Sequence, residues 1–220
     1  MQGRRSRRIE FCPPTAIKLF IGHGVANDLA EVECFRERFG TEVKILADAQ
    51  WLYSRADALL LGRGLQALGV QFFETPINAE DIVGNAELAS CLDLPIALGE
   101  TERTRWEVLP FLQQRAVDVL QPDVGRSGIS ETVRIAFMAD LYNVPIALHC
   151  GVGFGPYLAA TLHVAAAIPN LLYAEYQPDM QELARDTYGA RFVIEDGCAL
   201  LPDAPGLGID GPAAALVSTG

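Results

Sequence analysis

Short and almost uninterrupted apolar runs alternate with amphipathic stretches along most of the chain. The runs are predicted strands, and their lack of apolar–polar alternation indicates burial on both faces, as in a parallel sheet. They lie at 16–22, 43–48, 70–74, 95–100, 117–123, 144–149 and 171–175. Between them apolar residues recur at helical spacing, as from Leu29 to Phe39 and from Ala56 to Leu68, and Gly40 and Gly69 follow as helix stops. Repeated strand–helix units predict an α/β fold with a parallel sheet.

The length of each unit favours a barrel over an open sheet. A strand with its helix takes close to the ~30 residues expected of a (β/α)8 barrel. A doubly wound sheet is the alternative, but the glycines around His23 are too few for its phosphate-binding turn. We predict a TIM-type barrel of about seven strands over 16–189. A basic arm at 1–15 precedes it, and a Gly-, Pro- and Ala-rich segment at 190–220 packs on it.

Composition narrows the classes of partner. The 220 residues carry a formal net charge of −11, which argues against nucleic-acid binding. No apolar run approaches the roughly 20 residues of a membrane span, so no membrane partner is predicted. The five cysteines form no CxxC pair or disulfide framework, which favours a reducing, cytoplasmic location. The arginine-rich start, MQGRRSRR, has no apolar stretch after it and is not a secretory signal.

Charged residues close six consecutive predicted strands. These residues are Asp48, Glu74, Glu100, Asp123, His149 and Glu175. Their successive spacings are 26, 26, 23, 26 and 26 residues, about one strand–helix unit each. Side chains at the carboxyl ends of barrel strands share one rim, and barrel active sites lie on that rim. The sequence therefore predicts that these six groups form one site.

Three neighbouring carboxylates, Asp48, Glu74 and Glu100, would repel one another and raise one another's pKa values. A divalent cation removes this conflict, and oxygen ligands favour Mg²⁺ before Ca²⁺ or Mn²⁺. The alternative is that each carboxylate pairs with a local arginine. The candidate arginines are Arg103, Arg105 and Arg126.

Asp123 and His149 close adjacent strands, and a carboxylate beside an imidazole sets its tautomer and raises its basicity. This pair is a candidate general base directed at a metal-bound substrate. His23 follows the first predicted strand and could line the site. His163 lies within a predicted helix and is expected to be packed there.

Several motifs together resemble the C-terminal barrel of the enolase superfamily, in its mandelate racemase-like subgroup. They are LADAQW around Asp48, FFETP around Glu74, ALGE ending at Glu100, QPDVGRSG around Asp123, LHCG around His149, and LHVAAAIPN followed by YAE at Glu175. The closing LPDAPGLGID also matches, so that the resemblance covers about 16–211.

The resemblance implies that Asp48, Glu74 and Glu100 are Mg²⁺ ligands and that Asp123 and His149 are a proton-transferring dyad. Glu175 matches the acid that hydrogen-bonds the substrate carboxylate. The shared chemistry is removal of the proton alpha to a carboxylate, with stabilisation of the resulting enediolate. For this chain it implies a lyase that dehydrates a sugar acid.

Three positions depart from the family pattern. Lys18 matches the first lysine of a Lys-x-Lys motif, but Phe20 occupies the position of the second, which serves as a base. This disfavours two-base racemisation and favours one-base chemistry through His149, with Lys18 as an alternative base. Gln50 replaces a common asparagine and can still donate a hydrogen bond to substrate. Thr75 replaces a common glutamate, and little consequence is expected.

The family's N-terminal capping domain and first barrel strand are not visible in the sequence, and RIEFC at 8–12 is a candidate substitute strand. An open barrel edge favours homo-oligomerisation or other association. The alternatives to a dehydratase are a racemase, epimerase or cycloisomerase of the same superfamily. A truncated, non-catalytic metal-binding barrel is a third possibility.

Overall fold

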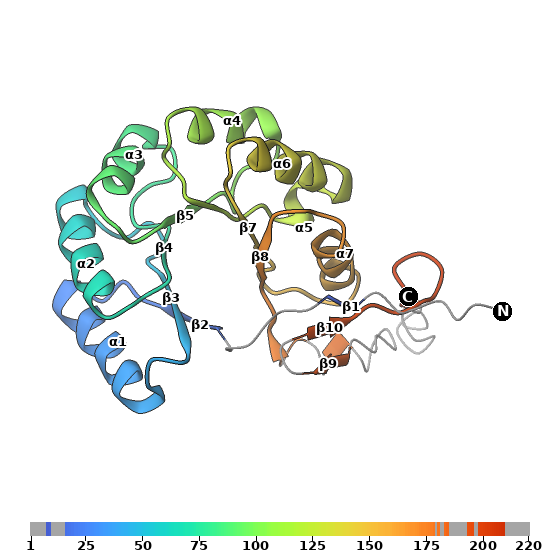
Figure 1. Cartoon of the computed structure of the whole chain (residues 1–220), viewed down its shortest axis with the longest axis horizontal. Coiled ribbons are helices and arrows are strands. Elements are labelled where there is room, and N and C mark those ends of the chain that lie inside the picture. The colour runs from blue at the N-terminus through green and yellow to red at the C-terminus, as the bar shows by residue number, and fades with distance from the viewer. Residues whose placement is uncertain are drawn as a thin grey trace, which may run out of the picture.

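Seven strands form one parallel sheet, as predicted, in the order β2-β3-β4-β5-β6-β7-β8. The computed structural model describes residues 8–9, 16–178, 180, 183–184, 193–195 and 198–209. The strands are β2 (Ala16–Phe20), β3 (Lys44–Asp48), β4 (Phe72–Glu74), β5 (Ile96–Leu98), β6 (Val119–Leu120), β7 (Ile146–Leu148) and β8 (Leu171–Ala174). They curl into an open arc with the helices on its outer side (Figure 1). This is an incomplete TIM-type barrel.

A helix follows each of the first six strands. The helices are α1 (Val25–Phe39), α2 (Arg55–Ala67), α3 (Ile82–Cys91), α4 (Arg105–Gln113), the short α5 (Val124–Ser127), α6 (Ile129–Leu141) and α7 (Pro156–Ala165). Side-chain caps define where α2, α3 and α4 begin, because Ser54, Asp81 and Thr104 accept hydrogen bonds from first-turn N–H groups. None of the described helices is long and apolar enough to cross a membrane.

Alternating side chains divide the strand residues between two apolar layers. Phe73 and Leu98 belong to the large core that also contains buried helix residues. Leu46 and Phe72 belong to a smaller cluster with residues of the neighbouring strands. Because residues i and i+2 of a strand share a face, the side chains two positions beyond this cluster lie above it at the rim. The smaller cluster thus forms the floor of the predicted site.

A second, antiparallel sheet joins the two ends of the described chain. Strand β1 (Arg8–Ile9) pairs with β10 (Cys198–Leu200), which pairs in turn with β9 (Val193–Glu195). The described part of RIEFC therefore lies in this sheet, and the expectation that it substitutes for a barrel strand beside β2 is wrong at these two residues. Ala199 packs against α7 residues, including Leu158. The arm at 1–7 and 10–15 lies outside the described residues.

Candidate active site

The strand register brings the predicted rim residues together. Phe20 pairs with Asp48, and Asp48 pairs with Glu74, at the carboxyl ends of β2, β3 and β4. Farther along the arc, Asp123 and His149 form an isolated parallel bridge. Because parallel strands point the same way, one rim collects acidic groups that are far apart in sequence.

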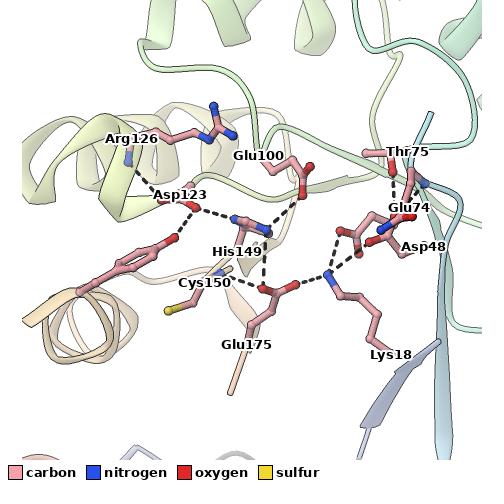
Figure 2. Close-up of polar contacts among 12 residues, drawn as sticks. Lys18, Asp48, Glu74, Thr75, Glu100, Asp123, Arg126, His149, Cys150 and Glu175 are labelled. Carbon is pink, nitrogen blue, oxygen red and sulfur yellow. Dashed lines mark hydrogen bonds and ion pairs between the residues drawn. The ribbon is translucent and has the colours of Figure 1, made fainter. Parts of the chain in front are cut away.

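The ammonium group of Lys18 lies among three of these carboxylates (Figure 2). Its Nζ is 3.0 Å from Glu74 Oε1 and 3.6 Å from Asp48 Oδ2, and it also donates to Glu175 Oε1. Burial opposes the charge of Lys18, but the three carboxylates outweigh this effect and raise its pKa. Lys18 therefore remains a cation here and carries no lone pair with which to accept a proton.

Asp48 and Glu74 are buried beneath the rim, at 5 % and 0 % exposure. Asp48 Oδ1 accepts hydrogen bonds from Thr75 Oγ1 at 2.9 Å and from the Gln50 backbone N–H at 3.0 Å. Glu74 Oε2 has no hydrogen-bond partner among the described residues. Burial raises the pKa of Glu74, Lys18 opposes the increase, and Asp48 adds to it.

Asp123 and His149 form the predicted dyad, with 2.5 Å between Asp123 Oδ2 and His149 Nδ1. Asp123 also accepts hydrogen bonds from the Tyr157 hydroxyl and from the Arg126 backbone N–H. Burial alone would raise the pKa of Asp123, but the hydrogen bonds from His149 and Tyr157 lower it overall. Asp123 is thus held as a carboxylate, which places the imidazole proton on Nδ1.

The other ring nitrogen of the dyad faces the remaining acids. His149 Nε2 lies 3.2 Å from Glu100 Oε2 and 3.8 Å from Glu175 Oε2. Burial lowers the pKa of His149, but the Asp123 hydrogen bond and the charges of Glu175 and Glu100 raise it overall. Glu175 also accepts a hydrogen bond from the Cys150 backbone N–H at 2.8 Å. Since Glu175 also contacts Lys18, it links the lysine cluster to the dyad.

The structure places the remaining candidates outside this side-chain network. The contacts described for His23 are made by its backbone, and its side chain is exposed. Gln50 contributes its backbone N–H to Asp48, with φ at +51°. Their roles as substrate contacts stay predictions. His163 lies within α7, with its Nε2 3.2 Å from the Leu207 carbonyl oxygen.

The candidate arginine partners bind elsewhere. Arg105 pairs with Glu131 at 2.9 Å, Arg103 donates its backbone N–H to Glu107, and Arg126 bonds Asp123 through its backbone. Within the described part of the chain, the basic side chains that contact Asp48, Glu74 and Glu100 are those of Lys18 and His149. The structure therefore does not support the alternative in which local arginines neutralise the three acids.

Asp48, Glu74 and Glu100 offer only carboxylate oxygens, the donors that a hard cation such as Mg²⁺ prefers. Glu74 Oε2 is buried and makes no hydrogen bond of ordinary geometry among the described residues, although the nearby Gln121 side chain lowers the pKa of Glu74. This oxygen can therefore serve as a ligand atom. Among the described residues, no three acidic, histidine or cysteine side chains are grouped as a metal site, and Glu100 is directed at His149. The donor chemistry fits Mg²⁺, provided that Glu100 turns away from His149.

Sequence reasoning missed Tyr157 as a residue of the site, and it named Thr75 but expected little consequence from it. Tyr157 lies in α7, 34 positions from the Asp123 that it bonds. Thr75 is 27 positions from Asp48. Their proximity to the rim could have been anticipated, because Thr75 follows β4 directly and Tyr157 lies in the first turn of the helix after β7. No spacing rule identifies which carboxylate each hydroxyl contacts.

The arc of β/α units, with an acidic rim and an Asp–His pair at its carboxyl end, defines a barrel-type protein equipped for acid–base chemistry. Residues 6–214 match the sequence family described as enolase C-terminal domain-like. The chain belongs to this family, as its motifs predicted.

The chain is similar in sequence and in fold to sugar-acid dehydratases and to a cycloisomerase. The chain is 39% identical over 194 residues to arabinonate dehydratase of Saccharolobus solfataricus, covering 87% of the chain and 52% of that protein. It is 33% identical over 204 residues to D-galactarolactone cycloisomerase of Agrobacterium fabrum, and this match covers 89% of the chain and 54% of that protein. Its fold matches the crystal structure of L-talarate dehydratase from Polaromonas sp. JS666 with Mg and L-glucarate. That match has a TM-score of 0.81 at 30% identity and covers 92% of the chain and 54% of the other. The chain thus spans about half the length of these relatives.

Proposed function

We propose that this protein takes part in Mg²⁺-dependent removal of the proton alpha to a carboxylate, as the first step in dehydrating a sugar acid. The observation that carries the proposal is the Asp123–His149 dyad. Asp123 binds Nδ1, and Nε2 faces the rim, where it lies 3.2 Å from Glu100 Oε2 and 3.8 Å from Glu175 Oε2. A buried imidazole oriented in this way is a general base placed beside an acidic ligand set.

Asp48, Glu74 and Glu100 are the residues that would hold Mg²⁺. The bound ion would supply positive charge to the carboxylate oxygens of the substrate as negative charge develops on them. The similarity to a dehydratase crystallised with Mg and L-glucarate supports this assignment.

His149 would act twice in a one-base elimination. Its Nε2 takes the proton from the carbon next to the carboxylate, and the resulting imidazolium returns a proton to the hydroxyl that leaves the neighbouring carbon as water. Asp123 keeps the Nδ1 proton in place through both transfers. The C–H and C–O bonds break, a C=C bond forms, and the enol converts to a 2-keto-3-deoxy acid.

Lys18 and Glu175 would bind and orient the substrate carboxylate. The hydrogen bond from Lys18 to Glu175 Oε1 supports this role, because it places the ammonium group beside the acid that matches the family's substrate-carboxylate contact. Phe20, at the family's second base position, is 54 % exposed at the end of β2. An apolar ring there disfavours racemase and epimerase chemistry, which needs a base on each face of the substrate.

Cycloisomerisation is the second candidate, favoured by the 33% identity to a galactarolactone cycloisomerase. It also needs only one base. The two reactions differ in their products, because a cycloisomerase rearranges a lactone without releasing water.

The test is turnover by the full chain with Mg²⁺ and a panel of arabinonate, xylonate, galactonate, galactarate, talarate and galactarolactone. Products are read by NMR in D₂O. We expect a 2-keto-3-deoxy acid from at least one acid, and a loss of about 10²–10⁴-fold in rate in His149→Asn. His163→Asn, a histidine away from the rim, is the matched control and should retain the rate.

Two results would count against the dehydratase. A rearranged lactone with no keto acid would assign the cycloisomerase reaction. Tight Mg²⁺ binding without turnover of any panel member would assign a non-catalytic, metal-binding barrel. Homo-oligomerisation and the cytoplasmic location remain predictions, to be read by light scattering and by cell fractionation.

A further inference from the structure

Thr75 occupies an unusual backbone position directly after β4. Its φ is +43°, in the left-handed region that β-branched residues avoid, and its side chain is 1 % exposed. Two backbone hydrogen bonds hold it there. Its N–H donates to Ala97 O at 3.0 Å, and its carbonyl accepts from Trp51 N–H at 2.8 Å. The strand on one side and the loop after β3 on the other therefore determine where its hydroxyl points.

That hydroxyl points at Asp48 (Figure 2). Thr75 Oγ1 donates to Asp48 Oδ1 at 2.9 Å, inside the buried floor of the rim. A carboxylate can only accept, so the direction of this hydrogen bond is settled. With the Gln50 N–H as second donor, Oδ1 has two partners, and the other oxygen, Oδ2, faces Lys18 at the centre of the acidic cluster.

We propose that Thr75 is a positioning residue for Asp48, holding one carboxylate oxygen so that the other is presented to a bound Mg²⁺. The proposal rests on the metal site of the proposed function. It departs from the expectation that a threonine in place of the family's common glutamate has little consequence. An ionised glutamate could not donate to Asp48, whereas a hydroxyl can. Hydrogen-bonded partners of this kind commonly contribute 10–100-fold to metal affinity.

The test is calorimetric titration of Mg²⁺ into the full chain and its variants. Thr75→Val keeps the shape and the branch at Cβ but removes the donor, so we expect about 10–100-fold weaker binding. Thr75→Ser restores the hydroxyl and should bind within about threefold of wild type. Thr132→Val is the matched control, because Thr132 is also buried and its hydroxyl donates to the carbonyl of Gly128, the N-cap residue of α6. It should leave the affinity unchanged.

A valine in this backbone conformation can impair folding. A second pair of variants, neither of them branched at Cβ, therefore differs only in whether the hydroxyl is present. Thr75→Ala should bind about tenfold or more weakly than Thr75→Ser, with folding checked by circular dichroism. Equal affinities in that pair, or a Thr75→Val variant that is folded and binds like wild type, overturn the role of Thr75 alone. Absence of Mg²⁺ binding by the wild-type chain overturns the metal site itself, and the role of Thr75 with it.

Discussion

The Tyr157 hydroxyl donates to a carboxylate that is 3 % exposed, and its removal should have a measurable cost. In Tyr157→Phe, Asp123 keeps two donors, His149 Nδ1 and the Arg126 N–H. A hydrogen bond to a charged group contributes roughly 1.5–3 kcal/mol. Because the Tyr157 ring is only half-buried, water offsets part of the loss. We expect a decrease of about 1–2 kcal/mol in the free energy of unfolding at pH 7.

The effect should depend on pH in a defined direction. The pKa of Asp123 is lowered in the folded protein. The contribution of Asp123 to the free energy of unfolding is therefore complete above the ordinary pKa of an aspartate, and it is lost as pH falls through the pKa of the folded state. Tyr157→Phe removes one cause of that lowering and moves the folded pKa back towards the ordinary value. The difference in the free energy of unfolding between wild type and Tyr157→Phe should therefore be largest near neutral pH and should decrease below about pH 4.

Urea denaturation, followed by tryptophan fluorescence, measures this difference. Tyr173→Phe is the matched control, because Tyr173 is also half-buried and its ring packs against Phe72 with centroids 6.4 Å apart. No described residue hydrogen-bonds its hydroxyl, so that variant should change the free energy by less than about 0.5 kcal/mol. Equal losses in the two variants, or a loss in Tyr157→Phe that does not change with pH, would refute the reasoning.

Three further predictions concern the ligand set, the helix ends and the thiols. At 100 times Kd, Mg²⁺ should stabilise wild type by ~2.7 kcal/mol and Glu74→Gln by almost nothing. Glu102→Gln, which removes a half-buried carboxylate outside the ligand set, should keep the full gain. Thermal melts with and without the ion test this. Arg36 donates four hydrogen bonds to carbonyl oxygens near the ends of α1 and α2. Arg36→Met should therefore lower the free energy of unfolding, measured by urea denaturation, by about 2 kcal/mol. Arg38→Met, at an exposed position, should lower it by less than about 0.5 kcal/mol. Burial raises the pKa of Cys150 to about 12, so mass spectrometry should find it unmodified by iodoacetamide under native conditions that alkylate the exposed Cys34 and Cys91.

The sequence was sufficient to predict the barrel units and the rim, because continuous apolar runs identify buried parallel strands and a parallel register aligns their ends. Asp48 and Glu74 are neighbours for that reason. Strand length was predicted less well. The run at 117–123 contains only Val119–Leu120 as β6, since periodicity reports burial and not where a ladder of hydrogen bonds stops.

The partners of each charged group could not be predicted. Lys18 was expected at the rim, but that it contacts three carboxylates at once depends on how far the arc curls. Similarly, the hydroxyl of Tyr157 reaches Asp123 only because α7 packs beside α5. Such contacts arise from the packing of whole elements, about which the sequence pattern of one element carries no information.

The linkage of the lysine cluster to the dyad through Glu175 has a consequence for the order of encounter. Five carboxylates share this rim with one lysine and one histidine. The electrostatic potential at the rim is therefore negative, so that it attracts cations and repels anions. A sugar acid is itself an anion. In the proposed function, the divalent ion should therefore enter first, and the organic acid only after the local potential has been reduced. Stopped-flow experiments should then show compulsory ordered association, with on-rates for the acid that increase with prior metal occupancy.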